Sequence, residues 1–371
     1  MFVGITNTSR DYAWGSHGEI SALLGLPPTD SIEAELWLGA HPGSPARIVG
    51  SDETLIDVVG GRLPFLLKVL AAGSALSLQA HPTMAQAQEG FARENALGIP
   101  LDAPNRNYKD AFYKPELIYA VSDEFHALCG FRSAAGIRML VEKQLPEATA
   151  LLDRLQGDDT LRDVFEWLIT RGPSVDELIA TVVAHADRTT PELSTVVDLA
   201  ESYPGDPGIV ISLMLNRVTL AKGEALYLPA GNIHAYLKGV GVELMASSDN
   251  VLRGGLTPKY IDVPELLAVL DFRPVAVPYL LPEHPSANVE VFRPDVPDFV
   301  LAVIDDEGAY ELTGPAIALC TAGDLELVGA AGAYNLSQGD AVYITPDEGS
   351  LTFAGLGTAF LATTGIEHPV P

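Results

Sequence analysis

Ala75-Leu-Ser-Leu-Gln-Ala-His-Pro82 places two side chains that can bind a metal ion, Gln79 and His81, two residues apart in an extended segment. Side chains alternate between the two faces of a strand, so residues at i and i+2 lie on the same face. Ser77 belongs to that face as well. A neighbouring strand with suitable side chains would therefore complete a metal site here.

Two later segments offer the missing ligands. Tyr113-Lys-Pro-Glu116 supplies a carboxylate, and Leu228-Pro-Ala-Gly-Asn-Ile-His-Ala235 supplies a second imidazole. Two imidazoles, one carboxylate and one amide suit Zn²⁺ or another first-row divalent ion, and they leave room for water or substrate oxygens. We therefore predict four metal ligands: Gln79, His81, Glu116 and His234. His41 is not included, because its Ala-His-Pro-Gly context is typical of a turn.

These segments and several others, in the same order, resemble type I mannose-6-phosphate isomerase, a zinc-dependent family of the cupin superfamily. The resemblance covers most of the first 270 residues. Its other motifs are Asp11-Tyr-Ala-Trp-Gly15, Ala34-Glu-Leu-Trp-Leu-Gly-Ala-His-Pro42, Pro64-Phe-Leu-Leu-Lys-Val-Leu70 and Ser248-Asp-Asn-Val-Leu-Arg-Gly-Gly-Leu-Thr-Pro-Lys259. One departure is Phe112-Tyr113, where the family commonly has Asn-His. This difference puts one polar contact near Glu116 in doubt.

The resemblance implies an aldose-ketose isomerase that interconverts mannose 6-phosphate and fructose 6-phosphate. The reaction moves a proton between C1 and C2 through an enediol, and one Zn²⁺ per chain would stabilise the developing charge. By the same resemblance, Arg253 matches the family's catalytic arginine, Asp249 acts with it, and Lys114 assists. The expected substrate-binding residues are Lys68, Ser77, Tyr236, Glu243 and Lys259.

The residues themselves leave the catalytic base open. Asp249, Glu243, Lys114 and His81 can each transfer a proton if they lie within hydrogen-bond reach of the sugar. Asp249 has a second explanation, since Ser248-Asp-Asn250 is also typical of a turn. Two classes of protein compete with the isomerase: a metal cupin of another kind, such as an iron oxygenase or an isomerase for another hexose phosphate, and a sugar-binding cupin without activity.

The charge of the chain excludes some partners and restricts others. A formal net charge of −27 argues against nucleic acid, whose phosphates require clustered Lys and Arg. A phosphorylated sugar then requires that the few cations gather locally. Lys68 is placed inside the apolar run Phe65-Leu-Leu-Lys-Val-Leu70, where either an anion compensates its charge or the side chain reaches solvent.

Composition indicates the compartment. The chain has no apolar run of the ~20 residues that span a bilayer and no signal-peptide pattern, so we expect no membrane partner. Cys129 and Cys320 lie far apart, as expected for free thiols in a reducing compartment. We therefore expect a cytoplasmic protein. The sequence leaves the oligomeric state open, with a monomer favoured.

The 371 residues predict a mainly β fold with a helical insertion: two cupin, or jelly-roll, β-barrel domains plus an all-helical domain. The metal-binding domain is expected to be discontinuous (1–132 and 204–270), with the helical domain at 133–203 and the second β domain at 271–371.

Local patterns predict the individual elements. Helices are expected at 83–97, 137–152, 160–169, 175–186 and 263–270, because apolar residues recur there with helical spacing. Residues 63–80 are expected to form two strands joined by a hairpin or short loop, and strands are expected to resume at 209–218 and again beyond residue 288.

Overall fold

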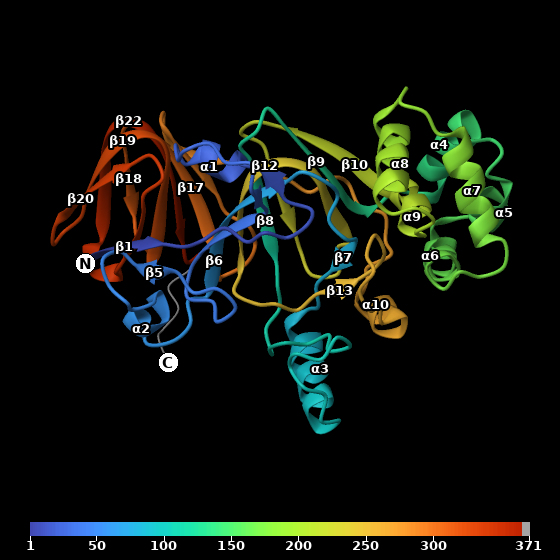
Figure 1. The fold of residues 1–371 in the computed structure, drawn as a ribbon, viewed down its shortest axis with the longest axis horizontal. Helices are drawn as coiled ribbons and strands as arrows, with labels where there is room; N and C mark the ends of the chain where they lie inside the picture. The colour runs from blue at the N-terminus through green and yellow to red at the C-terminus, as the bar shows by residue number, and fades with distance from the viewer. Residues whose placement is uncertain (366–371) are drawn as a thin grey trace.

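The computed structural model describes residues 1–365, which form two ten-stranded sheets with helices gathered mainly at one end (Figure 1). Strand pairs throughout both sheets are antiparallel. The prediction of a mainly β protein with a helical insertion is therefore confirmed. Within residues 1–365, no helix has the length and apolar character that crossing a membrane requires.

The first sheet occupies the middle of the molecule and carries the predicted ligands (Figure 1). Its strands are β4 (Glu35–Leu38), β6 (Phe65–Ala72), β7 (Gln79–Ala80), β8 (Glu116–Ala120), β9 (Glu124–Phe131), β10 (Leu215–Ala221), β11 (Ala225–Leu228), β12 (His234–Ala246), β13 (Leu252–Arg253) and β14 (Tyr279–Leu280). The long strand β12 organises it, because its first residue pairs with β7 and β9 and its second half pairs with β6 and β8.

The alternation of side chains along β6 separates a structural face from a functional one. Phe65, Leu67 and Val69 enter an apolar core shared with the second sheet. Lys68 and Leu70, on the opposite face, line a cavity. All of β6 is buried, so this strand forms the wall between the core and the cavity.

The link from β6 to β7 is not a hairpin, which corrects that alternative. The two strands do not pair with each other; both pair with β12, β6 along Gly239–Ala246 and β7 at His234. The short-loop alternative holds for residues 73–78. A sequence with two apolar runs and a Gly-Ser turn cannot show that both runs pair, one after the other, with a strand far along the chain.

The second sheet lies at the opposite end of the molecule from the helices (Figure 1). Its strands are β1 (Phe2–Thr6), β5 (Arg47–Ile48), β15 (Glu283–Ser286), β16 (Val289–Phe292), β17 (Val300–Asp305), β18 (Gly308–Glu311), β19 (Ala316–Val328), β20 (Ala333–Ser337), β21 (Ala341–Ile344) and β22 (Ser350–Thr363). The N-terminal strand β1 pairs with β21, so the two ends of the chain share one sheet. Strands beyond residue 288 were predicted and are confirmed. Two short strands, β2 (Ser16–His17) and β3 (Ile32–Glu33), form a separate pair.

Helices gather mainly at the other end of the first sheet (Figure 1). They are α4 (Ala134–Gln144), α5 (Thr149–Arg154), the 3₁₀ turn η1 (Asp158–Thr160), α6 (Leu161–Ile169), α7 (Val175–His185), α8 (Pro191–Ser202) and α9 (Gly208–Met214). Elsewhere lie α1 (Glu19–Leu23), α2 (Leu55–Val59), α3 (Met84–Ala96), α10 (Val263–Val269) and the turn η2 (Pro346–Glu348). The predicted helices 83–97 and 263–270 are confirmed as α3 and α10.

Two local predictions are wrong for identifiable reasons. The predicted helix 137–152 is two helices, because Pro146 disfavours a helical backbone at Leu145 and ends α4. The predicted strand 209–218 begins with helix α9, and only Leu215 onward is strand. All seven residues of α9 are buried, so the apolar run has no polar face whose period distinguishes helix from strand.

Candidate metal centre

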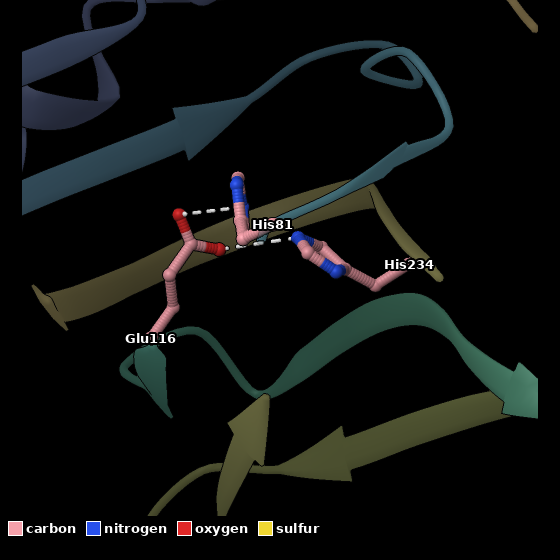
Figure 2. Close-up of side chains that lie close together, drawn as sticks. All are labelled: His81, Glu116 and His234. Atoms are coloured by element: carbon pink, nitrogen blue, oxygen red, sulfur yellow. Dashed lines mark ion pairs between the residues drawn. The ribbon is translucent and has the colours of Figure 1, made fainter. Parts of the chain in front are cut away.

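His81, Glu116 and His234 converge at the point where β7, β8 and β12 meet (Figure 2). One ligand atom from each lies within 4.8 Å of the others. The Nε2 atom of His81 is 3.2 Å from Glu116 Oε1, and that of His234 is 3.1 Å from Glu116 Oε2. None of the three is more than 1% exposed. The three predicted ligands are thus brought together in a dry setting.

In each imidazole, the hydrogen bond made by Nδ1 keeps the ring proton on that nitrogen, away from Glu116. His81 Nδ1 donates to the backbone oxygen of Asn250 at 2.7 Å, and His234 Nδ1 donates to that of Asn232 at 3.1 Å. In a neutral ring the Nε2 atoms then present lone pairs to the carboxylate. His81 Nε2 and Glu116 Oε2 are buried without a hydrogen bond. Electron pairs facing one another in this way fit a bound cation.

Burial and neighbouring charges hold the ligands in their metal-binding forms. Burial lowers the pKa of His81 to about 4, although Glu116 opposes the shift, so the ring is neutral at pH 7. Burial alone would raise the pKa of Glu116, but Lys114 at 2.8 Å and the imidazoles hold it well below its ordinary value. The site is therefore ready for a divalent ion without releasing protons at neutral pH.

Gln79 lies beside this cluster, as predicted from the i, i+2 spacing. It is directly opposite His234 on β12 and opposite Arg253 on β13. Its amide nitrogen is placed 3.4 Å from His234 Nε2. Amide nitrogen and oxygen are interchangeable by a flip, which would turn the oxygen toward the cluster.

A cavity of about 720 Å³ adjoins the cluster, and Gln79 and Glu116 form part of its wall. All the other predicted site residues line it: Lys68, Ser77, Lys114, Tyr236, Glu243, Asp249, Arg253 and Lys259. The site residues predicted from the sequence therefore surround one cavity. The individual roles of these residues stay predictions.

Lys68 is buried and paired with carboxylates, which settles how its charge is compensated. Its ammonium is 3.1 Å from Glu243 and 3.4 Å from Glu35, and it lies 4.7 Å from the ring centre of Trp37. Burial favours the neutral amine, but the two carboxylates raise the pKa of Lys68 above its ordinary value. The residue is only 4% exposed, so it does not extend into solvent. Two carboxylates of the chain itself compensate Lys68.

Arg253 and Lys259 differ from Lys68 in having no carboxylate partner among residues 1–365. Burial lowers the pKa of Arg253. Burial also lowers the pKa of Lys259, and the positive charge of Arg253 lowers it further. In a chain of net charge −27, two neighbouring cations without a counter-ion mark the part of the cavity that suits an anion.

Asp249 lies at the rim of the cavity and contacts a histidine that the sequence did not connect with it. His41 Nε2 is 3.5 Å from Asp249 Oδ2, and the backbone N–H of Gly43 donates to His41 Nδ1 at 3.1 Å. His41 is 4% exposed, whereas the Asp249 side chain is 43% exposed. The turn around His41 was predicted; its contact with Asp249 depends on tertiary structure and has no local signal.

Other wall residues were missed as contributors to the site. Tyr12, Trp14 and Trp37 form an aromatic side of the cavity. All three lie in motifs that carried the resemblance, which was the available signal. Tyr203 also lines the cavity, although it follows α8 in a segment to which the sequence assigned no chemistry. A tyrosine at the end of a helix has no feature that would mark it.

The departure at Phe112-Tyr113 is directed away from the cavity. Phe112 lies under the Arg62 guanidinium, 3.5 Å from the ring centre, and the Tyr113 hydroxyl donates to Asp298. Neither residue is part of the cavity wall formed by residues 1–365. These side chains instead fasten the segment that leads to Lys114 and Glu116.

Comparisons with known proteins agree over nearly the whole chain. The model of the catalytic domain of phosphomannose isomerase type I matches residues 2–134. Mannose-6-phosphate isomerase of Escherichia coli strain K12 is 37% identical, over 95% of this chain and 97% of the relative. The Rattus norvegicus enzyme of that name is 33% identical, over 91% and 92%. A crystal structure of mannose 6-phosphate isomerase bound with zinc and yttrium superposes with a TM-score of 0.90 at 35% identity, covering 98% of this chain and 100% of that one. With identity above 30% sustained across almost the full length, this chain belongs to the type I mannose-6-phosphate isomerase family.

Proposed function

We propose that this protein interconverts mannose 6-phosphate and fructose 6-phosphate. The observation that carries the proposal is the buried His81, Glu116 and His234 cluster at the wall of a cavity that also holds Arg253 and Lys259. A sugar phosphate has the matching features, with oxygens at one end and a dianion at the other. The relatives from Escherichia coli and Rattus norvegicus, matched over nearly their whole length, are named mannose-6-phosphate isomerase.

The proposed cofactor is one Zn²⁺ held by Gln79, His81, Glu116 and His234. The donor set and the unpartnered buried atoms of the cluster support it. A related isomerase structure contains zinc. A bound zinc ion supplies Lewis-acid stabilisation of negative charge on sugar oxygens. Lys114 holds Glu116 ionised at 2.8 Å, which keeps this ligand available.

The chain's own residues would bind and orient the substrate around that centre. Lys259 and Ser77, both on the cavity wall, are proposed to hold the phosphate by charge-assisted hydrogen bonds. Tyr236 is 1% exposed and its hydroxyl has no hydrogen bond, so it can receive one from a sugar hydroxyl or donate one. Glu243 and Lys68, paired at 3.1 Å, form a fixed polar floor for the sugar.

For the proton transfer we propose Asp249 as the base, with Arg253 as its catalytic partner and Lys114 assisting. Of the four carboxylates on the cavity wall formed by residues 1–365, Glu35, Glu116, Glu243 and Asp249, Asp249 alone is neither buried nor paired with a lysine. It can therefore take up and return a proton without breaking a buried ion pair. Burial raises the pKa of Glu243, and Lys68 opposes this shift. Glu243 is the less available proton acceptor because it is held in the buried pair with Lys68.

We also propose that the chain divides into two cupin-type β domains, one of residues 1–132 and 204–270 and one of 271–371, with 133–203 as a helical domain. Strands β1 and β5 of the first domain join the sheet of the second, and β14 of the second joins the sheet of the first. Separate apolar clusters inside each sheet support this division. The protein is proposed to act as a monomer in the cytoplasm. Its two buried free thiols support the proposed compartment.

The test is isomerisation of mannose 6-phosphate by purified protein before chelation, after chelation and after zinc is restored. Activity that disappears with the chelator and returns with Zn²⁺ is expected. Absence of turnover by zinc-loaded protein would reject the proposed reaction. A screen of other hexose phosphates would then separate an isomerase of different preference from a sugar-binding protein without activity.

A further inference from the structure

Asp206 connects the helical segment to a loop on the cavity wall. Its Oδ1 atom accepts two backbone hydrogen bonds, from Gly208 N at 2.7 Å and from Leu256 N at 2.9 Å. Asp206 lies between α8 and α9, whereas Leu256 lies 50 residues further along and lines the cavity. One carboxylate oxygen thus joins two distant parts of the chain.

The backbone at Leu256 explains why the loop requires such a bond. Leu256 has φ = +53°, a left-handed conformation that a residue with a side chain rarely adopts, and it is 1% exposed. Gly255, with φ = +125°, precedes it. The other side of the loop is bonded to Leu78, since Gly254 N donates to Leu78 O at 2.7 Å and Leu78 N donates to Gly255 O at 3.1 Å. Asp206 therefore supplies the restraint on the side away from Leu78.

The residues on either side of this loop are two of the cations on the cavity wall. Arg253 comes directly before it, and Lys259 comes three residues after Leu256. Both line the cavity, and the charge of Arg253 disfavours the charged form of Lys259. Like charges held close together without a counter-ion repel each other, so a fixed backbone between them is required to keep both on the cavity wall.

Asp206 acts here through its hydrogen bonds, because its charge does not contribute to the pKa shift of either cation. A second bond from the same segment reinforces the arrangement, since the Tyr203 hydroxyl donates to Ala75 O at 2.7 Å. Tyr203 and Asp206 both follow α8, so the end of this helix is attached to the two backbone segments that form one side of the cavity.

We propose that Asp206 is a positioning residue that holds the loop 254–259 so that Lys259 is directed at the substrate phosphate, while Arg253 keeps its place on β13 through the pairing with Gln79 on β7. The inference rests on the proposed function of the cavity. It gives the helical segment a part in substrate binding, although none of its charged side chains lines the cavity. The contribution is to phosphate affinity and leaves the metal cluster unaffected.

The test compares Asp206→Ser with Asp206→Asn in zinc-loaded enzyme. Serine can retain the local bond to Gly208 N but is too short to reach Leu256 N as well, which avoids the larger disturbance of an alanine. Asparagine keeps an oxygen acceptor at the same length. We measure the dissociation constant of inorganic phosphate by calorimetry, KM and kcat for mannose 6-phosphate, and zinc content. Melting temperatures confirm that each variant is folded.

Asp206→Ser is expected to weaken phosphate binding and raise KM about tenfold, the effect of ~1.4 kcal/mol, with kcat and zinc content nearly unchanged. Asp206→Asn is expected to remain within about twofold of the unmodified protein. Asp158→Ala is the matched control, because Asp158 Oδ1 also accepts a backbone bond in the helical segment, from Ala134 N at 2.7 Å, but does not contact the cavity loop.

Unchanged phosphate affinity in Asp206→Ser would overturn the inference, as would an equal loss in Asp206→Asn. Equal loss in Asp158→Ala would overturn it too, because the effect would then be general to the helical segment. Calorimetry separates this result from the proposed reaction. Loss of phosphate binding in Asp206→Ser supports the inference even if the protein does not isomerise mannose 6-phosphate.

Discussion

At the scale of single residues, the metal cluster was predictable, and the long-range charge pairs around the cavity were not. Gln79 and His81 follow from strand alternation, and Glu116 and His234 from motifs that resemble a known family. The pairing of Lys68 with Glu243 and the contact of His41 with Asp249 join segments about 175 and 210 residues apart along the chain. Such pairs depend on strand register and loop packing, which no short stretch of sequence contains.

The carboxylate of Glu116 determines whether metal binds. In Glu116→Gln the charge between the two Nε2 atoms is lost while the shape is kept. We expect zinc content to fall close to zero after gel filtration, and activity to fall with it. Metal analysis and isomerase assays check this. Glu124→Gln, on the exposed start of β9, is the matched control. Stoichiometric zinc in the Glu116 variant would contradict the ligand assignment.

The lowered pKa of His81 predicts how the metal-free protein responds to acid. In the unfolded chain this histidine titrates near 6.5, and in the folded chain near 4. Between these values the unfolded state binds more protons, so stability is complete above pH 6.5 and is lost as the pH falls toward 4. Glu116, whose pKa is also lowered, acts in the same direction at lower pH.

Urea unfolding of chelated protein at pH 7.0, 6.0 and 5.0 measures this effect. The free energy of unfolding of the unmodified protein is expected to decrease over the series by about 1–2 kcal/mol more than that of His81→Gln, which lacks the titrating ring. Parallel curves for the two proteins would show that His81 is not held neutral by the fold.

At the scale of elements, strongly periodic helices and alternating strands were predicted, and uniformly buried segments were not. The helix α3 has a capping box at Thr83 and Gln86 that marks its start in the sequence. In contrast, α9 is buried on all sides, and the apolar pattern of Ile209 to Met214 fits either a helix or a strand. That β6 pairs with β12 and not with β7 likewise depends on a strand far along the chain.

The row of side chains across β4, β6 and β12 predicts a strongly coupled buried pair. Trp37, Lys68 and Glu243 are directly opposite one another in the register of these strands. Lys68→Met removes the one cation between Glu35 and Glu243, and the two carboxylates then remain buried together. We expect a loss of about 3–5 kcal/mol in the free energy of unfolding at neutral pH, measured by chemical denaturation.

The double variant Lys68→Met with Glu243→Gln checks the cause of that loss. Neutralising one carboxylate should return a large part of the stability, so the two substitutions should be non-additive by more than about 1 kcal/mol. Additive losses would mean that Lys68 contributes through packing of its methylene groups and not through its charge.

At the scale of the whole molecule, the two sheets share one apolar core, and this couples the second sheet to a site that it does not line. Phe360 on β22 is 2% exposed and contacts Tyr119 on β8, with ring centres 5.2 Å apart. Strand β8 begins at Glu116, so the core supports the strand that carries a predicted ligand. β1 adds a second connection, since it leaves the first residues of the chain in the second sheet.

Because the core is shared, Phe360→Ala should lower the stability of the entire molecule without selectively damaging the site. We expect a loss of about 3–5 kcal/mol from the cavity it leaves, with unfolding still in a single transition when followed by far-UV circular dichroism, which reports on both sheets, and by release of zinc. Leu356→Ala is the matched control, since Leu356 lies on the same strand but is 78% exposed, and it should change stability by less than about 0.5 kcal/mol. If zinc release and the change in circular dichroism separated into two transitions, the sheets would be independent units. The role of the second sheet would then lie outside the stability of the metal centre.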